Sequence, residues 1–135
     1  MYEIEILLID DNPADIEMTR ETFNQNKLKN NLNIVSTGSE VLAFLRHEIQ
    51  VPQPDLILLD SAFMQDTRTI LDAIKQDDNL RDVPLFVLTT AGSQSTMPDY
   101  STPPNGFVNK PFDFVQFINA IKTVKTFKVA IVTTL

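Results

Sequence analysis

The sequence contains no cysteine and only three glycines among its 135 residues. Without cysteine, the chain can have neither disulfides nor thiolate metal sites, and it has no cysteine nucleophile. With so few glycines it has no glycine-rich phosphate loop and no dinucleotide fingerprint. The absence of these two motifs weighs against a nucleotide-binding enzyme.

Long apolar runs and clustered basic residues are also missing. No apolar stretch approaches the roughly 20 residues that a membrane-spanning helix needs. The acidic start, Met1–Glu5, lacks the layout of a signal peptide. We therefore expect a cytoplasmic protein with no membrane partner. The net charge is −7 and basic residues form no stripe, so nucleic acid is not expected as a partner, because phosphate binding needs a basic surface.

The remaining composition is that of a folded domain. Hydrophobic residues make up 43% and charged residues 21% of the chain, which is a normal globular balance. A chain of this length suffices for one hydrophobic core. We assign residues 1–126 to a single domain and residues 127–135 to an apolar C-terminal extension.

Short apolar runs alternate along the chain with segments of helical period. The runs that we predict as strands are Ile4–Ile9, Leu32–Val35, Leu56–Leu59, Leu85–Leu88 and Phe107–Asn109. Runs that are apolar throughout are typical of parallel strands covered on both faces. Strands that alternate with helices predict an α/β fold with a doubly wound parallel sheet.

Helix starts can be read from the capping residues. One helix is predicted from Pro13 to about Gln25, a second after Ser39 as its cap, a third around Ile70–Ile74 and a last one after Asp113. A further helix is expected in the segment 92–104, but three prolines lie there. Because proline breaks helix interiors, we predict that this fourth helix is shortened or irregular.

Polar side chains follow four of the apolar runs at their carboxyl ends: Asp10 and Asp11, Asp60, Thr89, and Lys110. The carboxyl ends of parallel strands meet at one edge of a sheet. Converging carboxylates repel one another unless a cation intervenes, and Mg²⁺ prefers such oxygen ligands. Asp60 is then the natural nucleophile for a phosphoryl group, with Lys110 offsetting its charge.

Each of these residues also has a simpler interpretation. Asp10 and Asp11 could cap a helix, since carboxylates are favoured near helix N-termini. Thr89 could simply end a strand, and the neighbouring Thr90 competes for its role. His47, the only histidine, is expected to be a solvated residue on a polar helix end rather than a ligand.

The sequence resembles the receiver domains of two-component response regulators over almost its whole length. The matching stretches are Ile6–Pro13, Pro54–Asp60, Leu88–Thr90 and Asn105–Phe112. The resemblance implies a flavodoxin-like sheet of five parallel strands in the order 2-1-3-4-5. The Asn12–Asp15 opening and the apolar tail resemble the small stand-alone regulators that partner phytochrome-like kinases.

Carried over residue by residue, the resemblance assigns roles. Asp60 is the phosphoacceptor, and Mg²⁺ is bound by Asp10, Asp11, Asp60 and the backbone carbonyl of Ala62. Thr89 and Phe107 form the switch, although Phe107 could equally be a core residue. Lys110 assists phosphorylation and precedes a cis bond to Pro111.

The same resemblance implies the partners. A sensor histidine kinase or phosphotransfer protein would donate the phosphate, and output would be contact with an unidentified downstream protein. The chain is then a signalling switch and no conventional enzyme.

Two departures from the family pattern leave a rival function possible. The loop Ser61–Thr67 lacks the usual proline and glycine and is one residue shorter, and prolines disrupt the expected fourth helix in residues 92–104. In addition, Phe107 replaces the commoner tyrosine. The rival is a pseudo-receiver, an interaction module that does not use phosphate. A phosphatase of the haloacid dehalogenase type is a weaker rival, because Ala62 stands where its second carboxylate is required.

The apolar C-terminal extension leads to a prediction about the oligomeric state. Val129–Val132 is an apolar run at the end of the chain, where exposed polar residues are the norm. It could pack back on the domain or form part of a homodimer contact. Sedimentation of a chain ending at Lys125 distinguishes the two: half the native mass supports the dimer, and an unchanged mass removes it.

Overall fold

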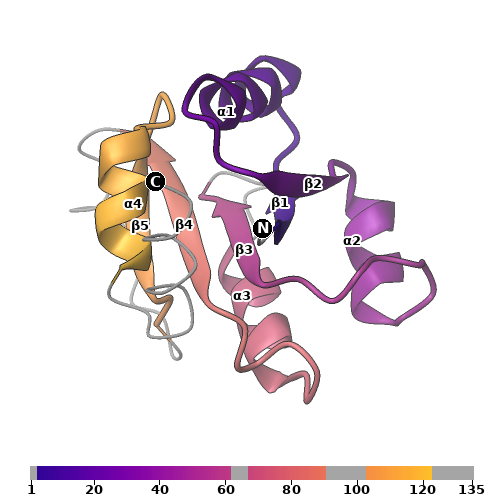
Figure 1. Cartoon of the computed structure of the whole chain (residues 1–135). Helices are drawn as coiled ribbons and strands as arrows, with labels where there is room; N and C mark the ends of the chain where they lie inside the picture. Colours follow the sequence, from indigo (N-terminus) through magenta and orange to yellow (C-terminus); the bar gives the residue numbers. More distant parts are fainter. Residues whose placement is uncertain (1–2, 62–66, 91–102, 123–135) are drawn as a thin grey trace.

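The computed structural model describes residues 3–61, 67–90 and 103–122. Its strands are β1 (Ile4–Ile9), β2 (Asn30–Val35), β3 (Leu56–Asp60), β4 (Leu85–Thr90) and β5 (Gly106–Lys110). Its helices are α1 (Pro13–Gln25), α2 (Gly38–Leu45), α3 (Thr67–Gln76) and α4 (Phe114–Ile121). Strands and helices alternate along the described chain except between β4 and β5, where residues 91–102 intervene (Figure 1).

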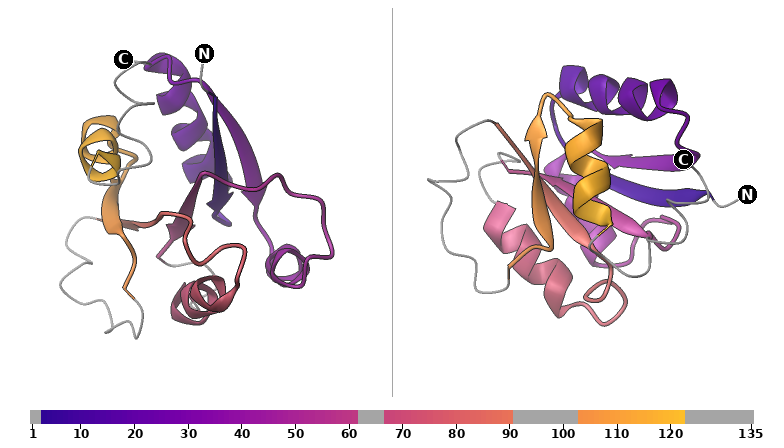
Figure 2. Two further views of the ribbon diagram at one scale, coloured as in Figure 1. Left: turned by 60° about the horizontal axis from the view of Figure 1, so that its bottom comes forward. Right: turned by 60° about the vertical axis from the view of Figure 1, so that its left-hand side comes forward.

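All five strands join one parallel sheet in the order β2-β1-β3-β4-β5. This confirms the predicted fold class and strand order. Helices α1 and α4 cover one face of the sheet, and α2 and α3 cover the other (Figure 2). The predicted fourth helix and the C-terminal extension lie outside the described residues.

The three central strands, β1, β3 and β4, are buried on both faces, as is typical of parallel strands. In β4, Phe86 and Leu88 pack under α1 and α4. Leu85 and Val87 pack under α2 and α3. The alternation of side chains along one strand thus supplies two separate cores.

Capping residues set where the helices begin. Asn12 caps α1, because its side chain accepts hydrogen bonds from the N–H groups of Ala14 and Asp15. Asp113 caps α4, as predicted. Ser39, however, was the wrong cap for α2: Thr37 accepts from the N–H of Glu40, and Glu40 accepts from the N–H of Thr37. This reciprocal pair starts the helix at Gly38 and places Ser39 inside its first turn.

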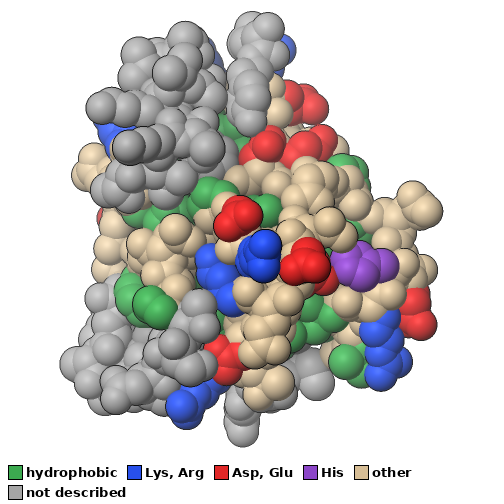
Figure 3. All heavy atoms as spheres, turned by 90° about the horizontal axis from the view of Figure 1, so that it is seen from below, with side chains coloured by type: hydrophobic (Ala, Val, Ile, Leu, Met, Phe, Trp, Pro, Cys, Tyr) green, Lys and Arg blue, Asp and Glu red, His purple; other side chains and the backbone are tan. Residues whose placement is uncertain are grey.

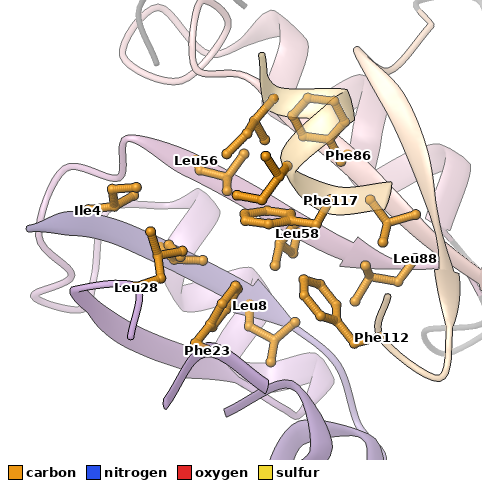
Figure 4. Packing of buried hydrophobic residues seen from close by; sticks show 14 residues of the cluster. Ile4, Leu8, Phe23, Leu28, Leu56, Leu58, Phe86, Leu88, Phe112 and Phe117 are labelled. Carbon is orange, nitrogen blue, oxygen red and sulfur yellow. The ribbon is translucent and has the colours of Figure 1, made fainter. Parts of the chain in front are cut away.

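Aromatic rings fill the core between α1 and α4 (Figure 4). Phe23 of α1 lies 5.1 Å from Phe112 and 5.3 Å from Phe117, measured between ring centroids. Edge-on contacts of this kind add to the gain from burial. The rings therefore hold α1 against α4 and against the chain that follows β5.

No helix within the described ranges combines the length and the apolar composition that crossing a bilayer requires.

Removal of one of these aromatic rings should destabilise the fold. We expect Phe117→Ala to lower the free energy of unfolding by about 3–5 kcal/mol, because Phe117 is fully buried. Urea denaturation measures this. Val115→Ala on the same helix is the matched control, since Val115 is 69% exposed. Equal effects of the two substitutions would contradict the packing described here.

Candidate functional site

Three carboxylates converge where β1 and β3 end. The two strands are paired, with Ile9 opposite Leu59. The next residues, Asp10 and Asp60, therefore lie side by side, and Asp11 follows. Oxygen atoms of the three carboxylates all lie within 4.8 Å of one another. The structure thus brings together the three acids that the strand ends predicted.

Asp10 is the most buried of the three acids, with none of its surface exposed. Its Oδ1 accepts a hydrogen bond of 3.0 Å from the N–H of Asn12. Within the described part of the chain, Oδ2 has no hydrogen-bond partner, although Lys110 Nζ lies 3.4 Å away. Burial, opposed by the Asn12 bond and assisted by the charge of Asp60, raises the pKa of Asp10 to about 6.

This arrangement fits a hard divalent cation. A buried carboxylate oxygen without a donor, beside two further carboxylates, is costly unless positive charge is supplied. Mg²⁺ takes oxygen ligands at short distances and commonly uses one or two carboxylates while keeping several waters. Asp10, Asp11 and Asp60 could hold it. The carbonyl of Ala62, the other predicted ligand, lies outside the described residues.

Lys110 supplies positive charge beside Asp60. It ends β5 and precedes a cis peptide bond to Pro111, as the resemblance implied. Its Nζ donates to Asp60 Oδ1 at 2.8 Å and to Asp15 Oδ2 at 2.9 Å. Burial alone lowers the pKa of Lys110, but these bonds and the nearby carboxylate charges raise it above its ordinary value. The ammonium therefore stays charged.

The two predicted switch residues lie on neighbouring strands. Thr89 is fully buried near the end of β4, where Leu88 pairs with Asp60 and Thr89 with Asn109. Phe107 is half-buried and packs against the core beneath α2 and α3. This packing agrees with the core interpretation of Phe107, and the switching role of both residues stays a prediction. The side chain of Thr90 is outside the described part.

Three contacts at the site were not predicted. Asp15, in the first turn of α1, pairs with Lys110. The Thr67 hydroxyl donates to the backbone carbonyl of Asp60 at 2.8 Å, and Gln116 accepts from the N–H of Asn109 at 2.6 Å. Of these residues, only Asp15 could have been identified from the sequence, because an acid in the first helical turn after β1 must lie near the carboxyl edge of the sheet.

His47 does not belong to the site. It lies just after the C-terminal end of α2, where its Nε2 is 2.9 Å from Asp77 Oδ2. Its side chain is 55% exposed. Figure 3 shows the histidine beside acidic side chains on a face where acidic and basic groups are interspersed. The expectation of a solvated histidine is confirmed, with an added carboxylate partner.

Comparison with known proteins gives one family. A family model described as the response regulator receiver domain matches residues 6–122. The response regulator Rcp1 of Synechocystis sp. (strain ATCC 27184 / PCC 6803 / Kazusa) is 29% identical over 133 residues, which are 95% of this chain and 90% of Rcp1.

Solved structures agree with this match. The bacteriophytochrome response regulator AtBRR is 32% identical, with a TM-score of 0.77 over 90% of this chain and 92% of AtBRR. The phosphorylated cyanobacterial phytochrome response regulator RcpA is 30% identical, with a TM-score of 0.69 over 93% of this chain and 94% of RcpA. The Mn²⁺-bound form of Rcp1 is 28% identical, with a TM-score of 0.68 over 90% and 93% of the two chains.

The raised pKa of Asp10 predicts a pH-dependent stability. In the folded state Asp10 takes up a proton near pH 6 instead of near its ordinary value of 3.8, so its burial as an anion costs stability above pH 6. Without divalent ions at pH 7.5, we expect Asp10→Asn to raise the free energy of unfolding by about 1–3 kcal/mol. The gain should shrink below pH 6 and vanish near pH 4.

Urea denaturation between pH 4 and 7.5 measures this effect. Asp78→Asn is the control, because the Asp78 side chain is 88% exposed and its loss should change little at any pH. A gain for Asp10→Asn that is independent of pH would show that the buried charge is not its cause.

Proposed function

The chain belongs to the family of response regulator receiver domains, and from this premise we propose that it accepts a phosphoryl group on Asp60. The observation that carries the proposal is the position of the Asp60 carboxylate. It lies beside two further carboxylates and accepts a hydrogen bond from the ammonium of Lys110. An anion placed in this way is suited to phosphoryl transfer, which depends mainly on positioning and on neutralising charge.

The reaction proposed is a displacement at phosphorus. A carboxylate oxygen of Asp60 attacks the phosphorus atom of a phosphohistidine and forms an oxygen–phosphorus bond. The nitrogen–phosphorus bond breaks, and its electron pair leaves with the imidazole, which then takes up a proton. Aspartyl phosphates of this kind are an established class of covalent intermediate.

Mg²⁺ is the proposed cofactor. When bound, it would neutralise charge on the phosphoryl oxygens. Asp10, Asp11 and Asp60 would hold it, and the buried Oδ2 of Asp10 supports this assignment. The Mn²⁺-bound form of the relative Rcp1 supports a divalent ion in proteins of this kind.

Lys110 has two successive roles in this proposal. Before transfer its ammonium restrains the Asp60 carboxylate through the bond of 2.8 Å. After transfer the same ammonium pairs with an oxygen of the new phosphate. A compact charge on a flexible stem suits both geometries.

The output would follow from a population shift. The Asp60 phosphate attracts the hydroxyl of Thr89, and Phe107 moves into the space that Thr89 leaves. The altered surface then contacts a downstream protein. The donor is a sensor histidine kinase or a phosphotransfer protein, and the phytochrome response regulators among the relatives favour a kinase of the phytochrome type.

Incubation with acetyl phosphate and Mg²⁺ tests the proposal. Intact-mass spectrometry should find one phosphoryl group per chain, lost on treatment with hydroxylamine because an acyl phosphate reacts with it. Asp60→Asn should abolish the adduct, and Lys110→Ala should reduce its formation by at least about tenfold. Asp78→Asn, which removes an exposed carboxylate, should leave it unchanged.

The rival pseudo-receiver predicts a different result. An equal adduct on Asp60→Asn, or none on the native chain with either acetyl phosphate or beryllofluoride, would favour an interaction module that works without phosphate.

A further inference from the structure

Asp15 forms the second strong contact of the Lys110 ammonium. Its Oδ2 accepts from Lys110 Nζ at 2.9 Å, almost the same distance as the 2.8 Å to Asp60. The third carboxylate, Asp10, is more distant at 3.4 Å. The ammonium is therefore shared between Asp60 and a side chain from a different element, α1.

The position of Asp15 is set by the start of α1. Its backbone N–H donates to the capping oxygen of Asn12 at 3.1 Å, which fixes the first helical turn beside the site. Among the described residues, the acids that could hold a cation together are Asp10, Asp11 and Asp60, and Asp15 is not one of them. Asp15 therefore acts on the site through Lys110 and through its charge.

The charge of Asp15 has opposite effects on the binding of a cation and on the binding of a phosphoryl group. A further carboxylate beside the three acids increases the attraction for a divalent cation. The same carboxylate repels an incoming phosphoryl anion, and it competes for the ammonium that this anion needs. One side chain can thus strengthen the first binding step and weaken the second.

We propose that Asp15 is a positioning residue that shares the Lys110 ammonium with Asp60, and so favours the cation-loaded, unphosphorylated state of the site. The inference rests on the proposed function, because it assigns Asp15 a role in the response of Asp60 to phosphate. Asp15 thereby sets how readily the site passes from the cation-loaded to the phosphorylated state.

A purely structural role for Asp15 makes a different prediction. If its bond to Lys110 only tied α1 to β5, losing it would loosen the site, and cation and phosphate would both bind more weakly. The sign of the two effects therefore separates the interpretations.

The test uses Asp15→Asn, with Mg²⁺ and beryllofluoride as probes in calorimetric titrations. We expect Mg²⁺ to bind about three- to tenfold more weakly to the variant than to the native chain. At saturating Mg²⁺, beryllofluoride should bind more tightly by a similar factor, because Lys110 is free to pair with it. Asp15→Ala, which removes the same charge, should give the same pair of shifts.

Glu17→Gln is the matched control. Glu17 lies on the same helix and carries the same charge, but its side chain is 59% exposed and its ion pair is with Arg20. Both affinities should stay within about twofold of the native values, so that an effect of net charge alone is separated from the contact with Lys110.

The outcomes separate a failure of the role proposed for Asp15 from a failure of the proposed function. If the native chain binds both probes but Asp15→Asn weakens both, or matches Glu17→Gln, the role of Asp15 is refuted and the proposed function stands. If the native chain binds neither probe, the proposed function itself fails.

Discussion

One ammonium group among several carboxylates is the interaction on which this site depends. Lys110 Nζ contacts Asp60 and Asp15 and lies near Asp10, and Asp11 completes the acid cluster. The negative charge exceeds the positive charge, and Asp10 is buried with an oxygen that has no donor among the described residues. The site is thus incomplete without further positive charge, which is the physical reason for a divalent cation there.

The fold concentrates this charge at one edge of the sheet and compensates for its cost elsewhere. Parallel strands carry the acids and the lysine to one edge of the sheet, while the apolar residues behind them fill two cores. The aromatic contacts among Phe23, Phe112 and Phe117 fix α1 against the chain that follows Lys110. Burial energy from the cores therefore offsets the repulsion that the carboxylates generate.

Much of this was predictable from the sequence, and the failures have physical causes. The apolar runs and their polar ends gave the sheet and the Asp10, Asp11, Asp60 and Lys110 cluster, because burial on both faces leaves a simple pattern. The Thr37 cap was missed because several hydroxyl residues precede α2, and only the partner Glu40 distinguishes them. Thr67 and Gln116 reach the site through side-chain rotamers, which no local pattern encodes.

A crystal structure of the chain with Mg²⁺ and beryllofluoride tests the central claim most directly. We expect a metal ion bound to carboxylates of the acid cluster, beryllofluoride on Asp60, and Lys110 Nζ within hydrogen-bond distance of a fluoride. Beryllofluoride bound away from Asp60, or Lys110 turned away from it, would contradict the claim that these groups form a single phosphoryl-accepting site.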